Sequence, residues 1–527
     1  MTDGQARDGQ AGEVQVGDVQ VGDVQGGGVR VNGVQGYDPR TGEPVGAPVP
    51  EASDVEVDAL ARAGAAAFPS WAALPAAERA SVLDAVADAL DASSSALVEV
   101  ADAETALGVP RLTTELKRTT NQLRLFGEVL REGSYVEATL DSANPDIIPP
   151  RPVLRRMLRP LGTVGVFSAS NFPFAFSVAG GDTASALASG CTVVVKAHPS
   201  HPRTSHETAR IVESVVPAGV FGIVHGQQAG VALVEHPAIK AVGFTGSTAG
   251  GRALFDLANS RPDPIPFYGE LGSVNPTVVL PDAAAARPEG FAAEFVGSLT
   301  LGVGQFCTNP GLLFAPADLV PALADAVTAA VGGPMLNERM CDSYRSGTEG
   351  LASSGLAELV ARGTASGEGW SVEPRLFQVS LETFAENLEK LTEEHFGPAG
   401  VVVTYTDPAD LEAVLPRLPG TLTGTVHAAE SEHDEAGRVA EALRPVVGRL
   451  IFNGWPTGVA VAWGMHHGGP WPATTSPLHT SVGATSIRRW LAPVSYQSWP
   501  DGLLPAELRD GNPLGIPRRV DGVLGVH

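Results

Sequence analysis

One cysteine of this 527-residue chain lies in a sequence context that suits a nucleophile. Cys307 belongs to the run Gly302-Val-Gly-Gln-Phe-Cys-Thr-Asn-Pro310, among small and polar residues rather than in a typical core setting. The thiolate of such a residue attacks electrophilic carbon. A small buried apolar side chain is the alternative interpretation. Cys191 and Cys341 lack a comparable context, and we expect both to be buried.

Two further side chains suit carbonyl or acyl chemistry. Glu270, in Phe267-Tyr-Gly-Glu-Leu-Gly-Ser273, is flanked by glycines and followed by an apolar segment. A carboxyl group in so tight a setting can have a raised pKa and act as a general base, whereas the alternative is an exposed turn glutamate. Asn171 follows an expected strand and precedes Phe-Pro, so it is either an oxyanion donor or a turn residue.

A glycine-rich turn offers a site for phosphate. It is the run Gly243-Phe-Thr-Gly-Ser-Thr-Ala-Gly-Gly251, between an expected strand and an expected helix over residues 252–258. Free backbone N–H groups at such a helix start attract phosphate, and Gly246 and Ser247 are placed to do so. An ordinary helix cap by Ser247 is the alternative. The adjacent pair His466 and His467 lacks a metal-ligand spacing, so we predict no metal site.

Around these residues the chain has the organisation of an α/β protein. Helical spacing of apolar residues predicts helices over 55–68, 76–90, 94–107 and 111–132. Beyond residue 160, short apolar strands alternate with helices. We expect strands over 162–167, 192–196, 223–224, 241–244, 277–280, 311–314, 400–404 and 449–452, and helices over 176–189, 206–216 and 230–235. This alternation predicts parallel sheets, which bind ligands beyond the carboxyl ends of their strands.

The two remaining segments differ in composition from this pattern. Residues 1–36 are dominated by Gly, Gln, Val and Asp, so we expect a solvated tail, with a short strand near residues 28–34 as the alternative. Residues 144–160 are rich in proline and carry the basic cluster Arg151, Arg155, Arg156 and Arg159. They are expected to form an extended connector or an edge strand.

The net charge of −24 argues against nucleic acid or an anionic membrane as a major partner, because both require a basic face. No apolar run is long enough to span a membrane, and the N-terminal residues lack the features of a signal peptide. The three cysteines do not suit a disulfide framework. We therefore expect a cytoplasmic protein.

Taken in order, these segments resemble the aldehyde dehydrogenase superfamily over residues 37–505. The resemblance rests on Asn-Phe-Pro, Val-Val-Val-Lys, Gly-Phe-Thr-Gly-Ser, Glu-Leu-Gly, Gly-Gln-Phe-Cys and Glu-Glu-His-Phe-Gly-Pro. It implies an α/β fold with a Rossmann-type cofactor domain, an α/β catalytic domain and a small oligomerisation arm. The implied bounds are 37–141 and 161–272 for the cofactor domain, 273–461 for the catalytic domain, 142–160 and 480–500 for the arm, and 501–527 for a C-terminal tail. A homodimer or homotetramer is expected.

The resemblance also implies roles for individual residues. Cys307 matches the nucleophile that forms a thiohemiacetal and then a thioester, and its backbone N–H holds the oxyanion together with Asn171. Glu270 matches the base that activates water. Five further residues match positions that bind the nicotinamide cofactor: Lys196, Gly246, Ser247, Glu394 and Phe396.

One departure from the family pattern bears on the cofactor. The family usually has an acidic residue three positions after the strand lysine, where this chain has Pro199. Without that carboxylate a 2′-phosphate is not repelled, so we expect NADP, with NAD as the alternative. Lys196 supplies a cation, and His198, Ser200, His201 and Arg203 lie nearby in the sequence.

Further motifs resemble one branch of the superfamily, the bacterial α-ketoglutaric semialdehyde (2,5-dioxovalerate) dehydrogenases. They are Lys-Ala-His-Pro at residues 196–199 and His-Gly-Gly-Pro-Trp-Pro-Ala-Thr-Thr at residues 467–475. The implied reaction yields 2-oxoglutarate. A fatty-aldehyde dehydrogenase and a non-catalytic NADP-binding member are the alternatives. A coenzyme A-acylating relative would lack the glutamate that Glu270 matches.

Overall fold

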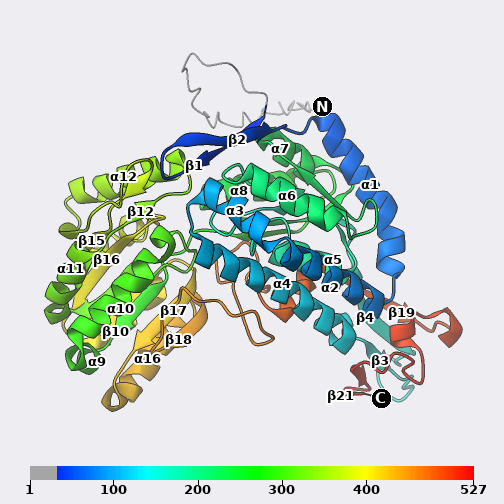
Figure 1. The fold of residues 1–527 in the computed structure, drawn as a ribbon. Coiled ribbons are helices and arrows are strands. Elements are labelled where there is room, and N and C mark those ends of the chain that lie inside the picture. The colour runs from blue at the N-terminus through cyan, green and yellow to red at the C-terminus, as the bar shows by residue number, and fades with distance from the viewer. Residues whose placement is uncertain (1–32, 527) are drawn as a thin grey trace, which may run out of the picture.

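The computed structural model describes residues 33–526, which form two α/β lobes and an arm that projects from one of them (Figure 1). The expected tail over residues 1–36 and the alternative strand near residues 28–34 lie almost wholly outside this range. The described chain starts with an antiparallel hairpin of β1 (Val34–Asp38) and β2 (Glu43–Val49). No helix in residues 33–526 is long and apolar enough to cross a membrane.

The first lobe is built on a five-stranded parallel sheet in the order β7-β6-β5-β8-β9. Its strands are β5 (Thr163–Phe167), β6 (Thr192–Lys196), β7 (Phe221–Val224), β8 (Ile239–Thr245) and β9 (Phe267–Glu270). Since β5 lies between β6 and β8, the chain changes direction across the sheet at β5. Ligands bind parallel sheets at such a switch point.

Helices cover both faces of this sheet, and β6 shows why. Val193 and Val195 enter one hydrophobic cluster, whereas Val194 enters another, because successive side chains of a strand point to opposite faces. The first face is covered by α2 (Ala76–Ala92), α4 (Val109–Glu132), α5 (Gly181–Ser189) and α6 (Pro202–Glu213), with α3 (Ser94–Thr105) packed on α4 and α6. The second is covered by α1 (Asp54–Ala73), α7 (Gln227–Glu235) and α8 (Thr248–Ser260).

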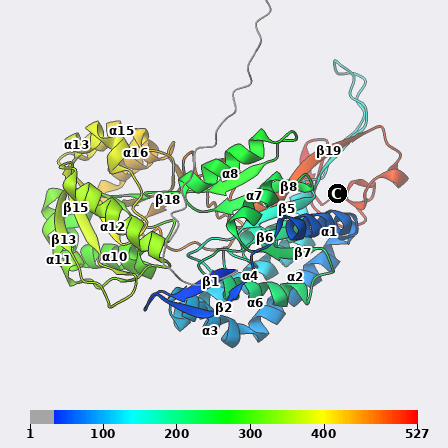
Figure 2. The same cartoon turned by 90° about the horizontal axis from the view of Figure 1, so that it is seen from above.

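The second lobe has a seven-stranded sheet in the order β13-β15-β16-β11-β10-β17-β18, parallel except for β13. Its strands are β10 (Pro276–Val279), β11 (Leu312–Pro316), β13 (Glu358–Arg362), β15 (Arg375–Ser380), β16 (Ala399–Tyr405), β17 (Thr421–His427) and β18 (Val447–Phe452). Figure 2 shows the two lobes side by side.

Helices also pack on both faces of the second sheet. One face is covered by α9 (Pro281–Ala286), α10 (Pro288–Thr300) and α11 (Val320–Ala329). The other is covered by α13 (Leu381–Glu386), α14 (Leu388–Leu391), α15 (Leu411–Val414) and α16 (His433–Leu443). The remaining elements are α12 (Glu338–Ser353) and the short pair β12 (Gly333–Pro334) and β14 (Ser371–Val372).

The arm is a five-stranded sheet in the order β19-β4-β3-β20-β21. Its strands are β3 (Thr139–Asp141), β4 (Leu154–Pro160), β19 (Leu491–Gln497), β20 (Arg518–Val520) and β21 (Val523–Gly525). The segment expected as a C-terminal tail supplies β20 and β21, and its Leu508 and Ile516 are buried in the core of the first lobe. It is therefore packed against the arm rather than separate from it.

The helix expected over residues 176–189 begins five residues later, at Gly181. The turn that replaces its start is tight: Gly181 donates its N–H to the Ala175 carbonyl, and a Cβ on Gly180 would lie 2.5 Å from the same oxygen. The apolar residues before the turn therefore pack as a loop. The four helices expected between residues 55 and 132 are present as α1 to α4.

After β18 the chain returns from the second lobe to the first, along residues 453–490. This return segment is fixed against the end of β9: Leu271 donates its N–H to the Ala473 carbonyl, and Thr475 donates to the Gly269 carbonyl. Thr474 forms an isolated β-bridge with Glu270. The return segment thereby brings residues from near position 470 to the junction of the lobes.

Candidate active site

Cys307 lies on a loop whose shape depends on close backbone contact. Gly302, Val303 and Gly304 all have positive φ, which ends α10 in a sharp change of direction. A Cβ on Gly304 would lie 2.3 Å from the carbonyl of Gly397, so only glycine fits there. Asn309 donates its side-chain amide to the carbonyls of both Gly304 and Gly397, at 3.0 and 2.9 Å. The loop is thus fixed to the segment that precedes β16.

A buried asparagine holds the backbone of the cysteine itself. Asn275, at the start of β10, donates through Nδ2 to the carbonyl oxygens of Cys307 and Asn309, at 2.8 and 2.9 Å. Its own oxygen accepts from Thr423 of β17 and from Ser273. Because both ends of this amide are used, the thiol is held at a defined position relative to the second sheet.

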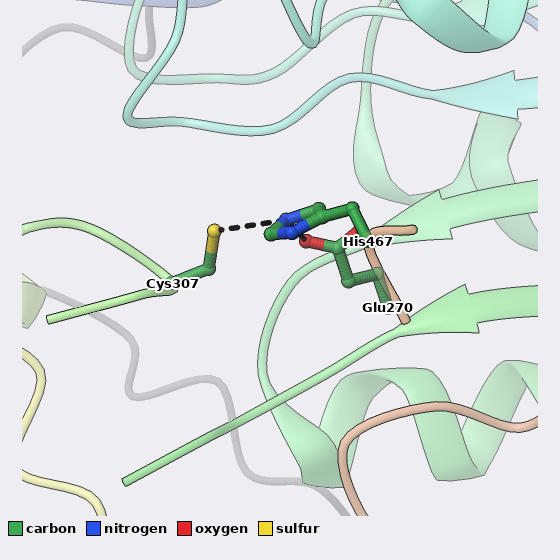
Figure 3. Close-up of side chains that lie close together, drawn as sticks. All are labelled: Glu270, Cys307 and His467. Carbon is green, nitrogen blue, oxygen red and sulfur yellow. Dashed lines mark hydrogen bonds and ion pairs between the residues drawn. The ribbon is translucent and has the colours of Figure 1, made fainter. Parts of the chain in front are cut away.

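The thiol, an imidazole and a carboxylate meet at the junction of the lobes (Figure 3). His467 Nε2 lies 3.5 Å from Cys307 Sγ and 2.8 Å from Glu270 Oε1. Ser481 donates its hydroxyl to the other carboxylate oxygen of Glu270. Both Glu270 and His467 come to this point through the contact between β9 and the return segment. The arrangement can move protons between a nucleophile, a base and water.

Burial and charge set the protonation of these groups. Burial, followed by the negative charge of Glu270, raises the pKa of Cys307 well above its usual range. The sequence left a general base with a raised pKa and an exposed turn glutamate as alternatives for Glu270; in the structure Glu270 is buried and its pKa is lowered. Burial alone would raise the pKa of Glu270, but the charge and hydrogen bond of His467 and the Ser481 hydroxyl outweigh it and lower the value. Glu270 is therefore a carboxylate at neutral pH, and the resting thiol is protonated.

Asn171 is buried next to the cysteine loop. Its Nδ2 donates to the Gln305 carbonyl at 2.9 Å, two residues before Cys307. The backbone carbonyl of Asn171 accepts a hydrogen bond from Arg111 of α4 at 2.7 Å. An asparagine amide carries two N–H groups, so the bond to Gln305 leaves one for a ligand near the thiol.

Lys196 lies at the carboxyl end of β6, beside the switch point. Burial lowers its pKa to about 8, although the charge of Glu51 opposes this change. The neighbouring residues are less available than their place in the sequence suggests. His201 is fully buried, with Nε2 3.0 Å from the Ala169 carbonyl, and Ser200 accepts a hydrogen bond from Asn337. Burial, then His201 and Lys196, lower the pKa of His198 well below its usual range, so His198 is neutral.

Gly246 and Ser247 form the turn between β8 and α8, at the same edge of the sheet. Ser247 caps α8 by accepting from the Gly250 N–H at 3.3 Å, as the alternative interpretation proposed. A Cβ on Gly246 would lie 2.7 Å from the Phe244 ring, and one on Gly251 would lie 2.1 Å from Leu271. The bare backbone at this helix start suits close approach of a phosphate group.

Glu394 and Phe396 line a cavity of about 30 Å³ together with Ser273, Gly304, Phe306 and Asn309. A Cβ on Gly272 would lie 2.5 Å from a carboxylate oxygen of Glu394, so glycine gives this side chain room. Although part of Glu394 reaches solvent, desolvation by the surrounding protein raises its pKa to about 7. The cavity thus presents a carboxyl group and an aromatic ring next to the cysteine loop.

Sequence reasoning missed His467 and Ser481 as site residues. His467 was set aside as a metal ligand on its spacing and otherwise appeared only within the motif at residues 467–475, yet His467, Glu270 and Cys307 offer three ligand atoms within 4.8 Å of one another. The contact to Cys307 spans 160 residues, so no local spacing could reveal it. The only signal was the placement of a histidine among small residues beyond the last strand of the second sheet.

Comparison with known proteins places the chain among enzymes. Residues 29–472 match the sequence model of the aldehyde dehydrogenase family. The chain is 46% identical to alpha-ketoglutaric semialdehyde dehydrogenase 2 of Azospirillum brasilense, across 93% of this chain and 96% of that protein. It is 44% identical to alpha-ketoglutaric semialdehyde dehydrogenase of Acinetobacter baylyi, across 92% and 94% of the two chains.

Solved structures agree with these relatives on the fold. An aldehyde dehydrogenase of Pseudomonas syringae in complex with NAD⁺ and octanal superposes with a TM-score of 0.76 at 22% identity, over 88% of this chain and 93% of that one. An NADP-dependent enzyme of Escherichia coli superposes with a TM-score of 0.75 at 23% identity, over 88% and 94%. The two-lobed fold with an arm is thus that of a known group of structures.

Proposed function

We propose that this chain, which belongs to the aldehyde dehydrogenase family, oxidises α-ketoglutaric semialdehyde to 2-oxoglutarate. The observation that carries the chemistry is the meeting of Cys307, His467 and Glu270 at the junction of the lobes. The observation that carries the substrate is the identity of 44–46% to two α-ketoglutaric semialdehyde dehydrogenases over more than nine-tenths of the chain.

The first step is attack of Cys307 Sγ on the aldehyde carbon. The thiol proton passes to the Glu270 carboxylate, and the sulfur forms a bond to carbon, which gives a thiohemiacetal oxyanion. We propose that His467 Nε2 carries a proton, because it lies 2.8 Å from a carboxylate oxygen of Glu270 and 3.5 Å from Cys307 Sγ. Once Glu270 is protonated, this N–H is free to donate to the sulfur, which stabilises the thiolate as it forms.

The oxyanion is held by the free N–H of the Asn171 amide and by the backbone N–H of Cys307. The bond from Asn171 to the Gln305 carbonyl supports this role, because it fixes the amide relative to the cysteine loop before substrate arrives. Donors that are already in place need no reorganisation when the negative charge develops.

NAD(P) is the cofactor of the family, and when bound it supplies the acceptor for the hydride that leaves the aldehyde carbon. The residues proposed to hold it are Lys196, Gly246, Ser247, Glu394 and Phe396. All lie at the carboxyl edge of the first sheet or in the cavity beside the cysteine loop. The bare turn at Gly246 and the glycine that makes room for Glu394 support the fit.

We propose NADP over NAD because Pro199 stands where the family usually has an acidic residue. The buried Lys196 provides the nearby positive charge. His201 and Ser200 already form hydrogen bonds within the protein. We therefore propose that Lys196, rather than either of them, binds the 2′-phosphate.

Deacylation of the thioester uses the same carboxylate. After Glu270 has released the first proton, it removes a proton from water, which attacks the thioester carbon and frees the acid product. A cavity of about 20 Å³ lined by Glu270, His467, Thr474 and Ser481 has polar walls and room for one water. It provides a path for the first proton to leave.

The remaining assignments follow from the family. We propose residues 37–141 and 161–272 as the cofactor domain, residues 273–461 as the catalytic domain, and residues 142–160 and 480–500 as the core of an oligomerisation arm. The arm exposes the apolar side chains Ile148, Trp499, Val523 and Leu524, which supports a homodimer or homotetramer.

A substrate panel tests the proposal. Steady-state kcat/KM is measured for 2,5-dioxovalerate, succinic semialdehyde and octanal with each cofactor, and 2-oxoglutarate is quantified as product. We expect 2,5-dioxovalerate with NADP to give the highest value. A preference for octanal would instead support the fatty-aldehyde alternative, and binding of NADP without turnover of any aldehyde would support a non-catalytic member.

A further inference from the structure

Helix α4 presents two arginines and a glutamate to the side of the site that faces away from the cofactor residues. Arg111, Glu115 and Arg118 lie four and three residues apart, so they share one helix face. Glu115 is buried and uses Oε1 to accept from the N–H groups of Phe174 and Ala175, at 2.8 and 3.0 Å. This bond holds the loop after β5, so Glu115 has a structural role of its own.

The two arginines differ in what they contact. Arg111 donates to the backbone carbonyl of Asn171 at 2.7 Å, and its guanidinium lies over the rings of Phe172 and Phe306, at 5.3 and 5.0 Å from their centroids. Arg111 therefore stabilises the loop after β5 that carries Asn171. Arg118 lies 5.2 Å from the Phe176 ring but makes no hydrogen bond or ion pair with any residue in the described range 33–526.

Arg118 is also close to the reacting groups. The Phe176 ring on which it rests lies 6.3 Å from the His467 ring, which in turn contacts Cys307. Burial lowers the pKa of Arg118, and the charges of Glu115 and Glu270 oppose this change. Its Nη1 is buried without a partner, whereas an uncompensated buried guanidinium is costly. A buried donor beside the site that the described protein leaves unsatisfied points to a ligand that satisfies it.

Other arginines of the arm and of the site each make at least one hydrogen bond or ion pair, although Arg111 Nη1, Arg155 Nε and Arg449 Nε are also buried without a partner. Arg155 and Arg156, in the basic cluster of the arm, pair with Asp510 and Glu137. Arg449, whose pKa also responds to Cys307, donates to the carbonyls of Pro456 and Gly458. Arg489 pairs with Asp182. Of Arg111, Arg118, Arg449 and Arg489, Arg118 alone makes no hydrogen bond or ion pair within residues 33–526.

We propose that Arg118 binds the carboxylate of an aldehyde acid substrate and thereby selects it over uncharged aldehydes. This inference rests on the proposed function, because α-ketoglutaric semialdehyde carries a carboxylate at the end of the chain opposite its aldehyde. A guanidinium presents parallel N–H donors that match a carboxylate, and the Phe176 ring holds its plane. With the carboxylate on Arg118, the aldehyde end is directed to Cys307.

The test compares charged and uncharged substrates in one variant. In Arg118→Met the side chain still packs on Phe176 but has no charge. We expect kcat/KM for 2,5-dioxovalerate to fall about 10- to 100-fold, mainly through KM, while that for pentanal stays nearly unchanged. Arg118→Lys should recover part of the preference. Arg124→Met, on the same helix but paired with Asp88 and Asp91 at the surface, is the matched control and should leave both values unchanged.

An unchanged ratio of the two kcat/KM values in Arg118→Met would overturn the inference, whether both values fall or neither does. Glutarate, a five-carbon dicarboxylate, separates this result from a failure of the proposed substrate. If wild-type enzyme does not prefer 2,5-dioxovalerate, the proposed substrate is wrong. The carboxylate site still stands if glutarate competes with pentanal and the competition weakens in Arg118→Met. Absent or unchanged competition by glutarate would overturn it.

Discussion

His467 Nε2 lies 2.8 Å from Glu270 Oε1, in a position where neither side chain exposes more than 4% of its surface. Since Cys307 Sγ is 3.5 Å from the same nitrogen, the N–H proposed for His467 is in reach of both the base and the nucleophile. The nucleophile and the base therefore do not ionise independently. Predictions for the three residues follow from this shared donor.

Replacement of His467 should change the pH dependence of the reaction as well as its rate. In His467→Gln, Glu270 loses the charge that holds its pKa down, so this pKa rises. Because the base must be ionised, the acid limb of the kcat–pH profile moves to higher pH, with a loss of about 10- to 100-fold at neutral pH. His466→Gln, the neighbouring histidine, should keep the wild-type profile. A lower rate with an unchanged acid limb in His467→Gln would contradict the effect of His467 on the pKa of Glu270.

Replacement of Cys307 should separate catalysis from cofactor binding. Cys307→Ala removes the atom that bonds to substrate, so we expect turnover to fall by several orders of magnitude while NADP still binds. Initial rates and a fluorescence titration of NADP measure the two properties. Cys341→Ala, which removes a buried thiol on α12 that has no proposed role in the reaction, is the control. Retained turnover in Cys307→Ala would exclude Cys307 as the nucleophile.

Glu270→Gln should make the Cys307 thiol more reactive and yet lower the steady-state turnover. The negative charge of Glu270 raises the pKa of the thiol, so its removal lowers that pKa and speeds alkylation of Cys307 by iodoacetamide at neutral pH. Steady-state turnover should nevertheless fall about 10²- to 10⁴-fold, because no base activates water. A burst of cofactor reduction would then mark the accumulated thioester. Slower alkylation in this variant would contradict the effect of the Glu270 charge on the pKa of the thiol.

The residue at position 199 should set the cofactor preference. We expect wild-type protein to bind NADP more tightly than NAD, and Pro199→Glu to reverse this order by placing a carboxylate against the 2′-phosphate. Equilibrium titrations of both cofactors give the ratio of dissociation constants. Pro199→Gln, which changes shape without charge, is the matched control. Tighter binding of NAD by wild-type protein would reject the NADP proposal.

Removal of metal should leave the activity unchanged. Glu270, Cys307 and His467 are close enough to hold an ion, but the shared N–H gives each of them a role without one. Enzyme dialysed against EDTA and assayed in metal-free buffer should keep its kcat. If activity is lost and returns with zinc, the cluster is a metal centre and the proton-transfer scheme is wrong.

Much of the framework was accessible from the sequence because its signals are local. The run Thr192–Lys196 is a strand of β-branched residues, and it occupies the interior of the first sheet as β6. The helix expected at residue 176 starts late because Gly180 and Gly181 form a tight turn, which helical periodicity does not report. Local patterns thus predict the type of an element better than its ends.

The site residues also differ in whether the local sequence could predict them. Cys307, Glu270 and Asn171 stand out by their own neighbours in the sequence, and the structure places Cys307 close to each of the other two. His467 and Ser481 reach the site only through the return segment, so their roles depend on contacts across 160 and 211 residues. The lowered pKa of Glu270 could not be predicted for the same reason, since both groups that lower it are distant in the chain.

The return segment also has a consequence for protein synthesis. The first lobe and the cysteine loop are both translated before His467 and Ser481, the latter at position 481 of 527. Since N-terminal units fold first as a chain emerges from the ribosome, the second lobe can form while the catalytic group is still incomplete, whereas the core of the first lobe also needs later residues such as Trp490. A nascent chain, or one truncated before residue 467, thus carries the nucleophile without the histidine that stabilises its thiolate. Activity is therefore acquired late in translation, after His467 and Ser481 have been added.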